Sequence, residues 1–257
     1  MKNNPRHNVP IKYFNSSTIE LSAPFLWLQK GWEDLCKIPY LSCFIGLCFS
    51  LLILTASYIV FRFGALMILP SCIFLAWVTP LLTYLLYHIS WSMTQGHTPS
   101  LFMFCIVLKR YLIQSTWVAV LLSIILLFWM RIEGILYALY PESTPTWQNL
   151  MLFLTVGSFI GALLAAITFM LLVFTPQILM EHDVDLVTAL YSSLKAIQKN
   201  KLVMCLWACL IGSGLMLGLV TLGFAFIILM PLYSYASWHA YQGALNMNAN
   251  TEQGVCA

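Results

Sequence analysis

Charged residues are scarce in this chain of 257 residues. Asp, Glu, Lys and Arg make up 8% of the sequence, hydrophobic residues make up 61%, and the mean hydropathy is +0.86. Soluble domains carry about a quarter charged residues, so these charges are too few to cover the surface of a water-soluble fold. The composition excludes a soluble protein and predicts an integral membrane protein that contacts the lipid bilayer and binds no nucleic acid.

Several motifs are missing as well. The eight cysteines form no CxxC pair, so we expect neither a disulfide framework nor a zinc site. Walker, HExxH and GxSxG motifs are absent, and no charged residue lies near the middle of a predicted span, where proton-coupled carriers generally need one. These absences argue against an enzyme, and no cofactor is expected.

Long apolar runs recur along the chain. They reach the roughly 20 residues that a membrane helix needs, and they are too continuous for the alternating strands of a barrel. The sequence therefore predicts an all-α, polytopic membrane helix bundle. Because residues 1–24 are polar and show no cleavable signal peptide, the first apolar run should act as the insertion signal. Six transmembrane helices are predicted at about 40–61, 65–91, 111–130 and 148–175, and as a hairpin within 202–245 that turns near Gly218 and Gly223.

Amphipathic segments precede the spans. One is predicted at 24–37, another at 92–111, and a third at 181–201, where Asp183 or Asp185 can cap the helix. The apolar stripe of the first segment consists of Phe25, Leu28, Trp32 and Leu35. Each segment with its two following spans would form one tandem unit. The expected organisation is a mobile tail at 1–24, a single membrane domain at 25–245 with units at about 25–96, 97–180 and 181–245, and a flexible tail at 246–257.

A motif near the C-terminus has an earlier counterpart. Tyrosine follows proline by four residues and histidine follows it by eight, both after Pro80 and after Pro231. This spacing indicates an internal repeat, and prolines inside spans are expected to bend them. The residues of this interfacial motif are Pro80, Tyr84, His88, Pro231, Tyr235, Trp238, His239 and Tyr241.

Basic residues indicate the orientation of the bundle. Most of them lie in the N-terminal region, at 92–111 and at 181–201, whereas the opposite side carries only Arg62 and Arg131. Because cytoplasmic loops are enriched in Lys and Arg, both termini of this multi-pass protein are expected in the cytoplasm.

Two passages carry a family resemblance. The first contains Trp27, Gly31, Trp32, Asp34, Leu35 and Pro39, and the second contains Asp183, Asp185, Ala189, Ser193, Asn200, Pro231, Trp238, His239 and Tyr241. They resemble an uncharacterised family of bacterial integral membrane proteins, some of which are labelled cytochrome c oxidase subunits. The resemblance implies a six-helix protein of the inner membrane and supplies no established activity. With five histidines, of which His7, His97 and His182 lie in polar segments, the chain cannot be a haem-copper catalytic subunit.

Two groups of residues allow a functional and a structural interpretation. His88 and His239 could be axial ligands of a haem, although an aromatic belt at the membrane interface explains them better. Glu181, His182, Asp183 and Asp185 could bind a hard cation, but capping and the helix dipole also favour acidic residues at a helix start. We expect the structural interpretation in both cases, and hence no metal.

The leading hypothesis for function is a non-enzymatic accessory, scaffold or assembly component of a membrane complex. Its partners would be a second copy of the chain or other subunits of that complex. The alternative is a transporter or channel for a small apolar or lipid-like molecule, built around Pro80, Pro176 and Pro231. A haem-binding redox subunit is a weaker alternative.

Overall fold

The computed structural model describes residues 19–96, 103–139, 147–182 and 184–245, and these residues fold as helices and turns. The expected tails therefore lie largely outside the described residues. The helices are α1 (Ala23–Lys37), α2 (Pro39–Phe63), the short 3₁₀ helix η2 (Ala65–Met67), α3 (Ile68–Thr94), α4 (Met103–Ala138), α5 (Trp147–Leu172), α6 (Thr175–Glu181), α7 (Leu186–Lys199), α8 (Lys201–Val220) and α9 (Phe226–Leu245).

Five helical segments of the described residues are long and apolar enough to cross a membrane. They are Pro39–Phe63, Ala65–Thr94, Ile106–Ala138, Asn149–Glu181 and Lys201–Val220. The predicted all-helical membrane fold is thus confirmed. The sixth predicted span is present as helix α9 but is not among these five. The reason is its composition, since serines and His239 reduce the hydropathy of a helix that faces protein more than lipid.

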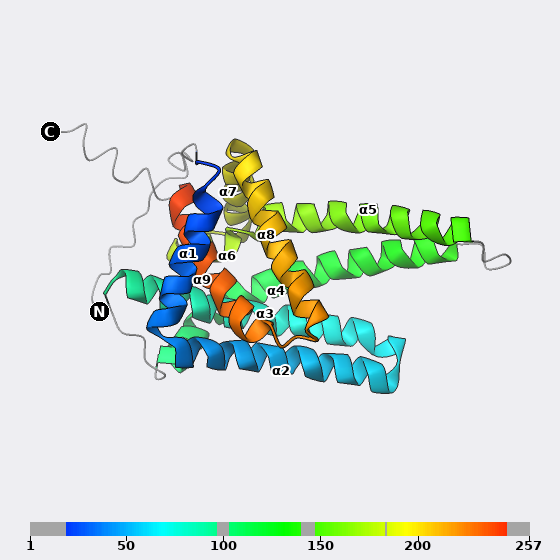
Figure 1. The fold of residues 1–257 in the computed structure, drawn as a ribbon, viewed down its shortest axis with the longest axis horizontal. Coiled ribbons are helices and arrows are strands. Elements are labelled where there is room, and N and C mark those ends of the chain that lie inside the picture. The colour runs from blue at the N-terminus through cyan, green and yellow to red at the C-terminus, as the bar shows by residue number, and fades with distance from the viewer. Residues whose placement is uncertain (1–18, 97–102, 140–146, 183, 246–257) are drawn as a thin grey trace.

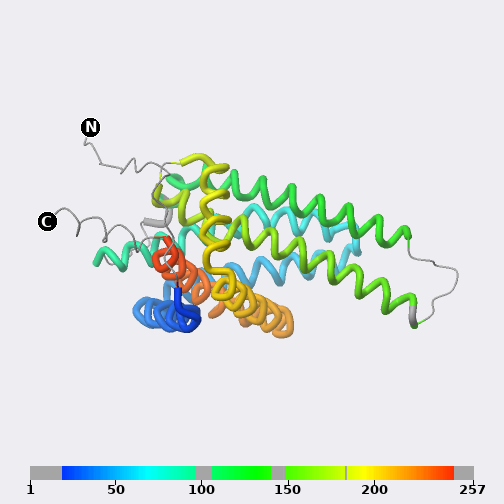
Figure 2. The backbone as a smooth tube through the Cα atoms, turned by 90° about the horizontal axis from the view of Figure 1, so that it is seen from above, coloured from blue at the N-terminus to red at the C-terminus, as the bar shows by residue number. Residues whose placement is uncertain are grey.

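Three helical hairpins leave one end of the molecule. Helices α2–α3 and α4–α5 extend in the same direction, whereas the α8–α9 hairpin is tilted and turns much closer to their starting point (Figures 1 and 2). Helices α1, α6 and α7 gather at that starting point with the last turns of α3 and α9 (Figure 1). We call this the collar end. The α8–α9 turn is the one predicted from the glycines, and Gly223 has φ +97° there.

The middle of the chain differs from its prediction. The separate amphipathic segment expected at 92–111 and the expected end of the third span near residue 130 are wrong, because α4 continues without interruption through Lys109 and Arg110 to Ala138. In contrast, α1 and α7 each end directly after a lysine, at Ile38 (φ −136°, ψ 59°) and Asn200 (φ −125°, ψ 45°). The break after a lysine is thus present in the first and third expected units and absent from α4, and the tandem organisation stays a prediction.

Helix α9 lies in the core and packs mainly against α1, α2 and α3. Two glycines allow this close packing. A Cβ atom at Gly31 of α1 would lie 2.8 Å from the backbone nitrogen of Ala236, and one at Gly46 of α2 would lie 2.1 Å from the carbonyl oxygen of Ile227. Any larger residue at either position would therefore push α9 away from its neighbour.

The buried face of α1 matches the predicted one only in part, because Leu35 is buried and Leu28 packs against the core as expected. Trp27, Gly31 and Leu35 face the bundle, whereas Phe25 and Trp32 of the expected apolar stripe are 58% and 50% exposed. Spacing alone favoured the stripe with more large apolar residues. Gly31 determines which face is buried, because only a residue without a side chain allows α1 to approach α9 this closely.

Candidate functional site

A buried carboxylate joins three helices at the collar end. Asp34 of α1 is 4% exposed, and its Oδ2 atom accepts hydrogen bonds from Ser90 Oγ of α3 at 3.0 Å and from His239 Nε2 of α9 at 2.8 Å. Its Oδ1 atom forms an ion pair with Lys37 Nζ at 3.0 Å. Both carboxylate oxygens are therefore engaged, and we call these four residues the Asp34 cluster.

The surroundings of Asp34 favour its charged form. Burial by itself raises the pKa of a carboxyl group, but the hydrogen bonds from His239, Lys37 and Ser90 and the charge of His239 outweigh burial and lower the pKa of Asp34 below its ordinary value. The carboxylate therefore acts as a charged anchor that holds α1 against α3 and α9. Ser90 is fully buried and donates to Asp34, so it has neither the access nor the activating base of a nucleophile.

Asp34 was missed as a site residue because it was assigned to the polar side of its helix. A signal was present, since Trp27, Gly31 and Asp34 are spaced by four and three residues and therefore lie on one face. The partners could not be found in this way, because His239 is 205 positions away in the chain.

A second polar contact connects the same end of α9 to α6. The hydroxyl of Tyr241, which is fully buried, donates to Glu181 Oε2 and lies 3.2 Å from His182 Nε2. Burial lowers the pKa of His182, and the negative charge of Glu181 opposes that shift. With His239 two residues earlier, α9 thus contacts acidic groups of both α1 and α6.

The residues considered as metal ligands do not act as one group. Glu181 and His182 contact Tyr241, whereas Asp185 caps α7 by accepting from the Thr188 backbone nitrogen at 3.1 Å. The side-chain and backbone hydrogen bonds from Thr188 lower the pKa of Asp185. Asp183 lies outside the described residues, and the part of the chain that is described holds no group of three potential ligands. The predicted cap at Asp185 is confirmed.

The two histidines of the repeated motif have different surroundings. His239 donates to Asp34, whereas His88 is 8% exposed and lies beside the rings of Trp91 and Tyr111, with centroid separations of 5.2 and 6.0 Å. No described residue accepts or donates a hydrogen bond at His88 Nδ1. The structure thus gives these histidines separate partners.

Aromatic residues of the same motif face inwards. Tyr84, Tyr235, Trp238 and Tyr241 are at most 1% exposed, so they fill the core at the collar end rather than forming a belt on its surface. Tyr235 also exchanges a 2.8 Å hydrogen bond with Ser42 of α2. The physical reason is that α1, α2 and α3 enclose α9, so the side chains that follow Pro231 meet other helices before they reach lipid.

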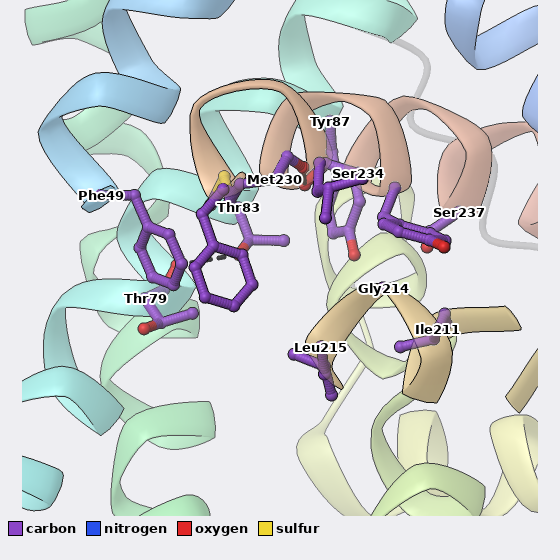
Figure 3. A pocket seen from close by; sticks show the side chains of 13 residues that line it. Phe49, Thr79, Thr83, Tyr87, Ile211, Gly214, Leu215, Met230, Ser234 and Ser237 are labelled. Atoms are coloured by element: carbon purple, nitrogen blue, oxygen red, sulfur yellow. Dashed lines mark hydrogen bonds between the residues drawn. The ribbon is translucent and has the colours of Figure 1, made fainter. Parts of the chain in front are cut away.

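A pocket of about 220 Å³ lies between α2, α3, α8 and α9 (Figure 3). Its lining has no charged residue and combines apolar side chains with hydroxyl groups. The lining residues are Phe49, Thr79, Thr83, Tyr87, Ile211, Gly214, Leu215, Phe226, Leu229, Met230, Tyr233, Ser234 and Ser237. Of the three prolines expected around a cavity, Pro80 and Pro231 directly adjoin lining residues, whereas Pro176 lies in α6, which contributes none.

The middle of the chain is similar to a family of membrane proteins, in agreement with the apolar helices described above. Residues 66–181 match the model of a family described as predicted integral membrane proteins, DUF2189. The DUF2189 match runs from η2 to the end of α6 and covers somewhat less than half of the chain. It confirms the expected resemblance to an uncharacterised membrane family, and it names no activity. No curated protein and no solved structure matches the chain.

Proposed function

We propose that this protein is a non-enzymatic accessory or scaffold component of a membrane complex, with its collar end in the cytoplasm of a bacterial cell and its hairpins in the inner membrane. The observation that carries the proposal is the Asp34 cluster, because its polar groups contact one another and fix α1 on the bundle. Buried groups of an active site would instead face a substrate space. The arrangement supports a rigid surface at the collar end, and it supports neither a nucleophile nor a general base.

The outer face of α1 is the docking surface that this proposal requires. On this face, Phe25 is 58% exposed and Trp32 is 50% exposed, whereas the opposite face of the same helix packs on α9. Aromatic anchors on a rigid element are typical of residues that dominate protein interfaces. The occupant would be another subunit of the complex or a second copy of this chain.

Site-specific photo-crosslinking in the native membrane tests the proposal. A photoreactive amino acid at Trp32 should capture one defined protein, with a constant mass across preparations. The same probe at Tyr58, which is 63% exposed on α2 within a membrane span, should capture lipid and no protein. If Trp32 and Tyr58 give the same products, or if the purified protein is monomeric and transports a solute in liposomes, the scaffold proposal is wrong.

A second candidate is transport of a small apolar or lipid-like molecule. The pocket between α2, α3, α8 and α9 favours it, because an uncharged lining beside the prolines inside α3 and α9 suits such a substrate. Proteoliposomes loaded with a fluorescent fatty alcohol would show protein-dependent exit of the dye. Exit at the rate of protein-free liposomes would exclude this candidate.

A further inference from the structure

The pocket between α2, α3, α8 and α9 has two chemically different ends (Figure 3). Tyr87, Ser234 and Ser237 lie at the end nearer the collar, since they follow Pro80 and Pro231 on helices that run towards it. Phe49, Phe226 and Leu215 line the rest together with Thr79 and Thr83, and the hydroxyl of Thr83 is already bonded to the carbonyl of Thr79. The lining is thus richer in hydroxyl groups at the collar side, and it carries no charge.

The polar end has unused hydrogen-bonding capacity. Gln177 of α6 is fully buried and its amide interacts with the hydroxyl of Tyr87, although neither amide atom makes a hydrogen bond of ideal geometry with a described residue. A buried amide whose hydrogen bonds are poorly aligned is stabilised by a further polar partner, such as a bound molecule or water. This amide is next to Tyr87, which lines the pocket.

The pocket opens on the apolar surface of the spans. Leu215 lines it and is 52% exposed, so an occupant can enter sideways from the lipid. Gly214 leaves room for the ring of Tyr233, because a Cβ atom at position 214 would lie 2.3 Å from that ring. The hydroxyl of Tyr233 donates a hydrogen bond to the carbonyl oxygen of Leu210 at 2.7 Å. Tyr233 therefore forms a fixed wall of the pocket rather than a plug.

Volume and charge together limit the occupant. An apolar cavity of about 150 Å³ holds a benzene ring, so about 220 Å³ accommodates one ring or a segment of one chain and excludes both chains of a phospholipid. The absence of charged lining residues disfavours ionised heads, which would be costly to desolvate without a partner.

We propose that this pocket binds one molecule of a single-chain, uncharged membrane amphiphile, with its hydroxyl or carbonyl head at Tyr87, Ser234 and Ser237 and its apolar body against Phe49 and Phe226. Binding in this pocket is independent of the scaffold proposal, which is tested by photo-crosslinking at Trp32. It also does not require transport, since an occupant can remain bound.

Photolabelling tests the site in the full-length protein, reconstituted in phosphatidylcholine nanodiscs. The probes are 1-hexadecanol, hexadecanoate and hexadecane, each with a diazirine near the middle of the chain. The expected result is saturable labelling of α2, α3, α8 or α9 by the alcohol, several-fold above labelling by the other two probes. Equal labelling by all three would show an apolar surface without a polar end and would overturn the proposal.

Two pairs of variants separate the site from general lipid contact. Thr83→Phe places a ring in the pocket, and Thr155→Phe on exposed α5 is its control, because both threonines donate to the carbonyl four residues earlier. Tyr87→Phe removes a hydroxyl from the polar end, with Tyr58→Phe as its control. Thr83→Phe should abolish saturable labelling, and Tyr87→Phe should weaken alcohol binding roughly threefold to tenfold. Variants that label like their controls would overturn the proposal.

Discussion

At the residue scale, Asp34 is the position where one side chain has the largest structural consequence. Asp34→Asn would leave His239 and Lys37 without their carboxylate and is expected to lower the free energy of unfolding by about 2 kcal/mol, the range for hydrogen bonds to a charged group. The measurement is thermal or denaturant unfolding in mild detergent, with tryptophan fluorescence as the signal that monitors unfolding. Glu33→Gln is the matched control, because Glu33 is exposed and its side chain accepts a hydrogen bond from Gln29, one turn earlier in the same helix. Equal stability of the two variants would contradict an anchoring role.

The same residue predicts a pH dependence. Because the pKa of Asp34 is lower in the folded than in the unfolded state, its contribution is complete above the unfolded pKa of about 3.9 and is lost as the pH falls through the folded pKa. The difference in stability between the wild type and Asp34→Asn should therefore be constant near neutral pH and shrink below about pH 4. A difference that stays constant down to pH 2 would show that Asp34 is not stabilised as a carboxylate.

At the scale of elements, the contact between α2 and α9 depends on a missing side chain. Gly46→Ala would place a Cβ atom 2.1 Å from the backbone of Ile227, so we expect a loss of about 1–3 kcal/mol from overpacking. Gly157→Ala in α5 is the control, since nothing lies within 4 Å of its added Cβ, and the better helix propensity of alanine should leave stability equal or higher. Unfolding in detergent distinguishes the two, and a neutral Gly46→Ala would mean that α2 and α9 separate easily.

The elements also show what could be predicted from the sequence. The boundaries of α2, α3, α8 and α9 follow from local signals, such as apolar run length, Pro39 and the turn glycines. The continuity of α4 could not be predicted, because Lys109 and Arg110 look like the end of a span but also fit within a helix. The inward position of Trp238 and the Asp34 cluster depend on which helices enclose α9, and that information is absent from any local window.

At the scale of the whole molecule, the charge distribution predicts one orientation. Most basic residues lie at the collar end, including Lys109 and Arg110 at the start of α4. The opposite end, near the hairpin tips, has only Arg62 and Arg131 among the described residues. Because positively charged segments stay in the cytoplasm, the collar end is expected there. Accessibility of single cysteines in an otherwise cysteine-free chain tests this. Cys36 is exposed on α1, and Leu66 is 83% exposed at the α2–α3 tip.

A membrane-impermeant maleimide should label Leu66→Cys in intact spheroplasts and should label Cys36 only after the membrane is opened. Both positions are reactive by exposure, so the difference reports the side of the membrane and not burial. As a control for reactivity, both sites should be labelled once detergent has opened inverted vesicles. If Cys36 were labelled first in intact spheroplasts, the collar end would face outwards, and a cytoplasmic docking surface on α1 would be excluded together with the orientation.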